Sequence, residues 1–417
     1  MRLILILALT LRLGVVSIVL FQYPKNWLFS KSPDLVFLAQ SLAAGHGLSS
    51  PFGGSTGPTA FLAPGYPALL GLVFRLFGGY SIASGAAMMG LQTLFAVMTA
   101  GIIMDVCSRI FGMPAARVAG AFWAVSPPLL WLPAVLWETS LSILLLIGMI
   151  DLALRCVDKQ GAGLWAGMGA CCGLAILVNP SLMLSLFAIV GWTIYQTRSV
   201  SGYEPWLFLL VFLAVFTPWP IRNARVLHAF IPLRSNFGYE VWQGNHPGAN
   251  GVFDRTMEPL GNKQEYLDYA TKGEVEYMRE KETLGRDYIR SRPGEFVRLS
   301  ADRVARFWTG AGLAVNSGVV ELHAVLTSLL GLAGLAGLWR RRRVKDRGRA
   351  VLFLLPLLVF PLPYYVTHAE FRFRLVLDPL LTILCAYAIT QANVYWQSRR
   401  SAAVASKACY SGSIGRS

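Results

Sequence analysis

The feature that most constrains the fold is a series of long apolar runs that follow one another along the chain. Of the 417 residues, 55% are hydrophobic and only 14% are charged. Lipid offers backbone N–H and C=O groups no water to pair with, so only helices and closed barrels span a membrane. The apolar runs are continuous rather than alternating, which argues against the strands of a barrel. We therefore predict an all-α polytopic membrane protein.

Ten apolar runs are candidate membrane spans, some of them near the lower length limit for a bilayer. The first run resembles a signal peptide, but Arg12 interrupts its apolar centre and no clear cleavage site follows, so we expect a retained helix. The predicted spans are 3–21, 81–104, 116–134, 138–155, 162–178, 181–197, 204–221, 320–338, 351–366 and 375–393.

The basic residues predict the orientation of these spans. The formal net charge is +15, which in a soluble protein suggests nucleic acid. Here the basic residues gather in short loops between apolar runs, above all in "WRRRRVKDRGR" at 339–349, so we expect no nucleic acid and both termini in the cytoplasm. Three regions follow: a membrane module at 1–221 with a first outer loop at 22–80, an outer region at 222–319, and a second membrane module with a cytoplasmic tail at 320–417.

The two outer loops contain further predicted helices. In "SPDLVFLAQSLAAGHG", Ser32 is a helix cap, Pro33 suits the first helical position and Asp34 the first turn. The run at 63–79 is too short to span a membrane, so we expect both segments to lie at the outer interface. The outer region reads as irregular over 234–251, and as helical over 262–308 with a break at Pro293.

Two carboxylates are candidate catalytic groups. Asp34 lies near the outer membrane surface, where it could act as a base toward a hydroxyl, although a carboxylate in a first turn also stabilises its helix through the macrodipole. Glu138 lies at the outer end of a hairpin between two spans, where ionisable residues are functional candidates. The alternative for Glu138 is a helix cap at the interface.

Several cationic residues lie on the outer side, against the usual charge trend. Arginine forks bind phosphate oxygens through two parallel hydrogen bonds, so this group is a candidate phosphate site. The alternative is contact with lipid head groups. Arg372 and Arg374 are two residues apart, so they diverge on a helix and share a face only in an extended segment. The candidate phosphate-binding residues are Arg222, Arg225, His368, Arg372 and Arg374.

Motifs for nucleotides and metals are missing from the sequence. There is no Walker motif, no dinucleotide fingerprint and no CxxC pair with metal spacing. We therefore expect no cofactor and no metal, although a divalent ion remains compatible with the sequence. A mechanism driven by ATP is unsupported.

Three segments in order carry a family resemblance: "PDLVFLAQSLAAGHGLSSPFG" at 33–53, "TPWPIRNARVLHAFIPLRSNFGYEVWQGNHPGANG" at 217–251 and "HAEFRFRLVLDPLL" at 368–381. Together they resemble bacterial membrane glycosyltransferases of the GT-C class, of the protein-mannosyltransferase-like family. That family implies a sugar donor carried on a polyprenyl phosphate, an acceptor that is a lipid, a glycan or a protein, and an active site on the outer face of the inner membrane.

The resemblance also implies roles for individual residues. The acidic residue of the family corresponds to Asp34, and outer basic residues hold the donor phosphate. Many relatives carry an adjacent acidic pair, whereas Asp34 is followed by Leu35, so Glu138 could act as a second carboxylate only by proximity in space. The alternative function is a transporter or flippase of lipid-linked sugars. It predicts inverted repeats, and the sequence contains none that we recognise.

Overall fold

The structure is a computed structural model that describes the chain except residues 24, 160, 198–201, 313–316, 342 and 415–417. The described residues form helices joined by turns, and the one β-bridge among them is the isolated pair Ser49 and Pro58. The long helices are α1 Arg2–Gln22, α5 Ile82–Phe111, α6 Met113–Val125, α8 Thr139–Lys159, α9 Ala162–Val178, α10 Met183–Thr197, α11 Glu204–Phe216, α17 Ser317–Trp339, α18 Val344–Val359 and α21 Asp378–Ile414.

The all-α fold predicted from the apolar runs is confirmed, and the chain is a multi-pass membrane protein. In the described part of the chain, six helical segments are long and apolar enough to cross a bilayer. They are Arg2–Gln22, Ile82–Phe111, Thr139–Lys159, Glu204–Leu227, Gly318–Trp339 and Val344–Val366. The predicted number of ten spans stays a prediction, because the other apolar helices are shorter or broken.

The predicted span 116–134 is wrong as a single helix. Helix α6 ends at Val125, and after Ser126 the chain continues as the short helix α7 Pro127–Trp131 and the 3-10 turn η1 Leu132–Ala134. The reason is local, because Pro127 and Pro128 have no N–H to donate to the preceding turn and their rings clash with it. The break brings the residues before Glu138 to the end of the bundle that holds the outer loops.

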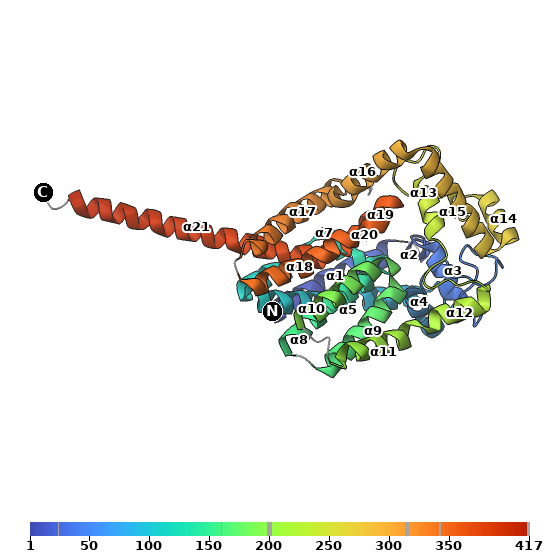
Figure 1. Cartoon of the computed structure of the whole chain (residues 1–417), viewed down its shortest axis with the longest axis horizontal. Coiled ribbons are helices and arrows are strands. Elements are labelled where there is room, and N and C mark those ends of the chain that lie inside the picture. The colour runs from blue at the N-terminus through green and yellow to red at the C-terminus, as the bar shows by residue number, and fades with distance from the viewer. Residues whose placement is uncertain (24, 160, 198–201, 313–316, 342, 415–417) are drawn as a thin grey trace.

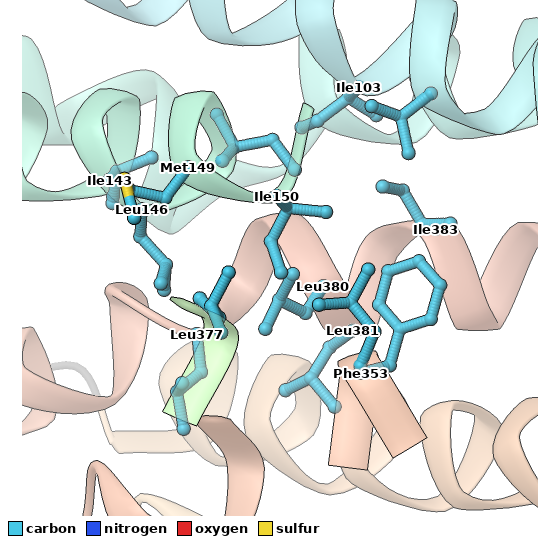
Figure 2. Close-up of a cluster of buried hydrophobic side chains, with 14 of the residues drawn as sticks. Ile103, Ile143, Leu146, Met149, Ile150, Phe353, Leu377, Leu380, Leu381 and Ile383 are labelled. Atoms are coloured by element: carbon cyan, nitrogen blue, oxygen red, sulfur yellow. The ribbon is translucent and has the colours of Figure 1, made fainter. Parts of the chain in front are cut away.

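The core of the bundle is formed by apolar side chains from helices far apart in the sequence. Figure 2 shows Ile103 of α5 and Ile150 of α8 close to Ile383 of α21, with Phe353 of α18 nearby. These side chains are fully buried. Burial of apolar surface inside the bundle therefore joins the N-terminal helices to the C-terminal ones.

The segment predicted as the first outer loop, 22–80, contains helices where the sequence predicts them. They are α3 Pro33–Ala43 and α4 Gly65–Phe77, preceded by the short α2 Lys25–Phe29. Pro33 begins α3 and Asp34 lies in its first turn, as predicted. The two helices pack on one another, where Gly71 of α4 leaves room for Leu42 and the Ala39 carbonyl.

The outer region lies beside the first outer loop at one end of the molecule, as Figure 1 shows for α3, α13, α14 and α15. Its helices are α12 Pro218–Leu227, α13 Phe237–Gly244, α14 Lys263–Lys272, α15 Glu274–Ser291 and α16 Pro293–Thr309. The buried Glu274 joins the two parts, since its carboxylate accepts hydrogen bonds from the Ala60 N–H at 2.7 Å and from the Tyr269 hydroxyl at 2.8 Å.

The prediction of irregular structure over 234–251 is corrected by α13. This short helix packs on α15, where Gly238 lies so close to the Cβ of Glu282 that a side chain would clash, and Tyr239 is buried beside Tyr277. Tertiary packing therefore stabilises a short helix whose two glycines disfavour it locally. The predicted break at Pro293 is confirmed, because α16 begins there.

The segment at 368–381, the last of the three that carry the family resemblance, lies at the end of the last connection and the start of α21. After α18 come two short helices, α19 Leu362–Val366 and α20 Phe371–Leu375, and then α21. Helix α21 begins at Asp378 and continues beyond the predicted end at 393, as the long C-terminal helix in Figure 1.

Candidate functional site

A cavity of about 1950 Å³ is lined by both outer loops and by the adjacent ends of the bundle helices. Its walls include the start of α3, the residues before α8, helix α13, the segment between α13 and α14, and the segment from α19 to α20. Aromatic side chains cover much of the surface, among them Tyr66, Trp137, Phe253, Tyr364 and Phe373. The cavity is large enough for a sugar phosphate together with part of a lipid.

The cavity gathers charged side chains from segments that are far apart in the sequence. Two arginines in its wall are paired: Arg372 forms an ion pair with Glu370, and Arg234 lies 3.5 Å from Glu240. Such pairs fix the position of each guanidinium while leaving donors free for a ligand. The charged residues and the histidine that line the cavity are Lys31, Asp34, Glu138, Arg234, Glu240, Arg255, Glu258, His368, Glu370 and Arg372.

Three carboxylates in the cavity wall have no cationic partner within the described part of the chain. They are Asp34, Glu138 and Glu258, whereas Glu240 and Glu370 take part in ion pairs. A carboxylate held near a cavity without a partner is available to a ligand or to a proton.

Asp34 lies in the first turn of α3, which positions its carboxylate at the cavity wall. Burial raises the pKa of the Asp34 carboxyl, and the charge of Glu138 adds to the rise, while the Leu35 N–H, Arg372 and Arg234 oppose it. The two carboxylates predicted from the sequence line the same cavity as Arg372. A carboxylate whose pKa is raised is a better proton acceptor at neutral pH than an ordinary aspartate.

Arg372 is held from several sides. Its guanidinium lies 5.1 Å from the ring centre of Trp137 and 5.2 Å from that of Phe373. Burial alone would lower the pKa of Arg372, but the charges of Glu370, Glu138 and Asp34 outweigh it, so the pKa lies above its ordinary value. The guanidinium therefore stays charged and is surrounded by more than one carboxylate.

His368 also lines the cavity. Its Nδ1 lies 3.4 Å from a Glu240 oxygen, and its ring contacts Phe253 edge to face at 5.2 Å. Burial lowers the pKa of the His368 ring, against the opposing charges of Glu240 and Glu370. The ring is therefore a neutral hydrogen-bonding group at neutral pH.

The structure places Arg374 away from the cavity, which corrects its grouping with Arg372. Arg374 is 0% exposed and forms an ion pair with Asp378 inside the bundle. It also donates to the Ala324 carbonyl at 3.1 Å, and His323 bonds the other Asp378 oxygen at 2.7 Å. The physical reason is the helical conformation of α20, in which residues two apart point in different directions.

Arg222 and Arg225 also lie outside the cavity lining. The Arg222 guanidinium donates to the backbone carbonyls of Leu48 at 2.8 Å and Thr59 at 2.7 Å, so it holds the connector of the first outer loop. Arg225 lies on the exposed side of α12. The positive charge of Arg222 therefore has a structural role.

Sequence reasoning missed Arg234, Glu240, Arg255 and Glu258. The argument that singled out Arg222 applies equally to Arg234, which follows the same span in "FIPLRSNFG". Glu258 stands in "RTMEPLGN", an irregular segment without any pattern that marks a site, so no local signal could have found it.

The described residues contain no group of three or more histidine, cysteine, aspartate or glutamate side chains placed to hold a metal ion.

Comparison with known proteins supports the family resemblance. Residues 62–221 match the family model described as dolichyl-phosphate-mannose-protein mannosyltransferase. Over 96% of its length the chain superimposes on the oligosaccharyltransferase of Archaeoglobus fulgidus in complex with zinc and sulfate, with a TM-score of 0.54 and 12% identity. The chain has a GT-C fold. The apo form of the same enzyme matches 95% of the chain with a TM-score of 0.52 and 10% identity.

The GT-C likeness spans about half of the oligosaccharyltransferase, because the match covers 50% of that chain in the complex and 51% in the apo form. ArnT from Cupriavidus metallidurans bound to undecaprenyl phosphate matches 91% of this chain and 77% of its own, with 14% identity and a TM-score of 0.38, too low to support a conclusion. No curated protein sequence matches the chain. The similarity establishes the fold, and the resemblance predicted from the three sequence segments is confirmed at that level.

Proposed function

We propose that this chain is an integral-membrane glycosyltransferase that moves a sugar from a polyprenyl-phosphate donor to an acceptor. The observation that carries the proposal is that Asp34 and Arg372 line one cavity at the end of a membrane bundle. A base and a phosphate-binding cation are the two groups that this transfer needs. The match to a family that uses dolichyl-phosphate-mannose supports the class of donor.

In the proposed reaction an acceptor hydroxyl attacks the anomeric carbon of the donor sugar. The new C–O bond forms as the bond between that carbon and the phosphate oxygen breaks, and the electron pair leaves with the phosphate. The hydroxyl proton passes to the Asp34 carboxylate. The products are the glycosylated acceptor, a polyprenyl phosphate with one additional negative charge, and a protonated Asp34, so atoms and charge balance. Direct attack inverts the anomeric configuration.

Arg372 is the proposed partner of the leaving phosphate. Its charge is secured by the surrounding carboxylates, and its position by Glu370, Trp137 and Phe373. Negative charge grows on the phosphate as the bond breaks, so a fixed cation stabilises the transition state more than the ground state. His368 is a neutral hydrogen-bonding group in the same wall and is the second proposed contact for the donor.

Glu138 influences the reaction through Asp34 in this scheme. Its charge contributes to the raised pKa of Asp34 and to that of Arg372. Glu138 is therefore a positioning residue of the site, and the role of second carboxylate that the sequence suggested for it becomes electrostatic.

The location of the reaction follows from the charge distribution. The 339–349 cluster favours the cytoplasm, and the cavity lies at the end of the bundle that carries both outer loops. We therefore place the site on the outer face of the inner membrane. Nucleotide sugars are not supplied there, so an activated sugar has to arrive on a lipid.

The test uses purified protein in detergent and a panel of undecaprenyl phosphates that carry mannose, glucose or a pentose. Mass spectrometry follows release of the sugar to water or its transfer to an added alcohol. We expect release from at least one donor by the wild-type chain and by Asp287→Asn, an exposed outer-region carboxylate on α15, and none by Asp34→Asn. A flippase binds such lipids without breaking the sugar–phosphate bond, so intact donors throughout the panel would refute the proposal.

A further inference from the structure

A compact turn of the outer region carries Glu258 to the cavity. The Asp254 side chain accepts a hydrogen bond from the Thr256 N–H at 2.9 Å, and the Gly261 N–H donates to the Glu258 carbonyl oxygen at 2.9 Å. A Cβ atom at Gly261 would lie 2.1 Å from a backbone carbonyl oxygen of the same turn. Only glycine fits there, so the turn is closed tightly and holds Glu258 in one place.

Glu258 has the properties of a group that meets a ligand. It lines the cavity together with Asp34, and it has no ion-pair partner among the residues that the structure describes. Burial raises the pKa of Glu258 to about 7, with the charges of Asp34 and Glu240 adding to the effect. The carboxyl thus lines the same cavity as Asp34, is half-buried, and can accept or donate a hydrogen bond at neutral pH.

The geometry points to Glu258 as the residue that binds a second hydroxyl of the acceptor while Asp34 meets the hydroxyl that reacts. This inference rests on the proposed transfer and deepens it by naming the class of acceptor, a molecule with more than one hydroxyl such as a glycan. Glu258 acts as a positioning residue: it takes no transferred proton and leaves the balance of the reaction unchanged.

Two observations favour a polyhydroxylated acceptor. Asp34 and Glu258 come from different loops and line one cavity, so together they can hydrogen-bond to two hydroxyls of one molecule. Phe253, close to the same turn, adds an aromatic face to the cavity wall, and apolar faces of this kind suit the C–H surface of a sugar.

The test uses competing nucleophiles and the undecaprenyl-phosphate sugar that is released fastest in the panel above. With glycerol present, the enzyme partitions the sugar between water and glycerol, and the ratio of glyceryl glycoside to free sugar is measured. This ratio does not depend on the fraction of folded enzyme. Glycerol offers a second hydroxyl to Glu258, and methanol does not, so methanol is the matched control among the acceptors.

We expect Glu258→Gln to lower the glycerol ratio about tenfold, the loss typical of one charged hydrogen bond. The methanol ratio should stay within about twofold of the wild type, and Glu276→Gln, at an exposed carboxylate on α15, should change neither ratio. An unchanged glycerol ratio, an equal fall with methanol, or a wild type that forms no glyceryl glycoside would overturn the inference. Absence of any sugar release refutes the proposed function instead, so the two failures are distinguishable.

Discussion

Replacing Arg372 by lysine separates a phosphate-binding role from a general need for positive charge. The guanidinium pairs with Glu370 through its Nε and lies over Trp137 and Phe373. Lysine keeps the charge but cannot keep the pair with Glu370 and also offer two parallel N–H groups to a phosphate. The loss of one charged hydrogen bond is about 1.5–3 kcal/mol, which corresponds to a fall in kcat/KM of between about tenfold and about a hundredfold.

The assay is the initial rate of sugar release over a range of donor concentrations. We expect Arg372→Lys to lower kcat as well as raise KM, because charge on the phosphate increases in the transition state. Arg290→Lys, at an exposed position on α15, is the matched control and should keep wild-type kinetics. Wild-type kinetics for Arg372→Lys would refute the reasoning, since contact with bulk head groups needs only a long cationic side chain.

Arg374 lies in the same segment as Arg372, but its predicted role is in stability and not in donor binding. Its guanidinium is buried with Asp378, so Arg374→Met removes one partner of a buried ion pair and should cost about 3–5 kcal/mol of stability. The thermal unfolding temperature should fall, while the fraction that remains folded should keep the wild-type KM for the donor. A raised KM without loss of stability would return Arg374 to the phosphate site.

Four further predictions follow from the site and the fold. Asp34→Asn should lower release about a hundredfold or more at a nearly unchanged unfolding temperature, since a carboxylate in a first turn adds only about 0.3–1 kcal/mol to its helix. Release by the wild type should fall as the pH is lowered through the pKa of Asp34, which lies above the ordinary 3.8, because only the ionised carboxylate accepts a proton; a profile that is flat down to pH 3.8 would contradict the assignment. Glu274→Gln should lower the free energy of unfolding by about 1–3 kcal/mol, measured by thermal unfolding, because its buried oxygens join the two outer loops. Cysteines introduced at Arg347 and Asp287 should react with impermeant reagents from opposite sides of the membrane, and labelling of Arg347→Cys from outside would refute the orientation.

Part of the site could be predicted because its signals are local. Ser32, Pro33 and Asp34 begin a helix wherever such a sequence occurs, so the position of Asp34 in the first turn of α3 was readable from the chain. The same holds for the helix start at Pro293 and, in hindsight, for the break that Pro127 causes after α6.

Other parts of the site were not readable, because they depend on contacts between distant segments. The sequence offers no reason for Glu258 to line the same cavity as Asp34, since the two residues lie in different predicted outer loops that the fold brings together. Helix α13 likewise forms because α15 packs on it, against the local preference of its two glycines.

The sequence by itself determined that this chain is a bundle of membrane helices, because an apolar run in lipid can satisfy its backbone hydrogen bonds only within a helix. It also determined that the segment at 368–381 carries two arginines next to an apolar run. The tertiary structure decided how that charge is used. Arg372 and Arg374 are chemically identical and two residues apart, but the turn of α20 directs Arg372 to the cavity and Arg374 to Asp378 inside the bundle, where burial makes an ion pair obligatory.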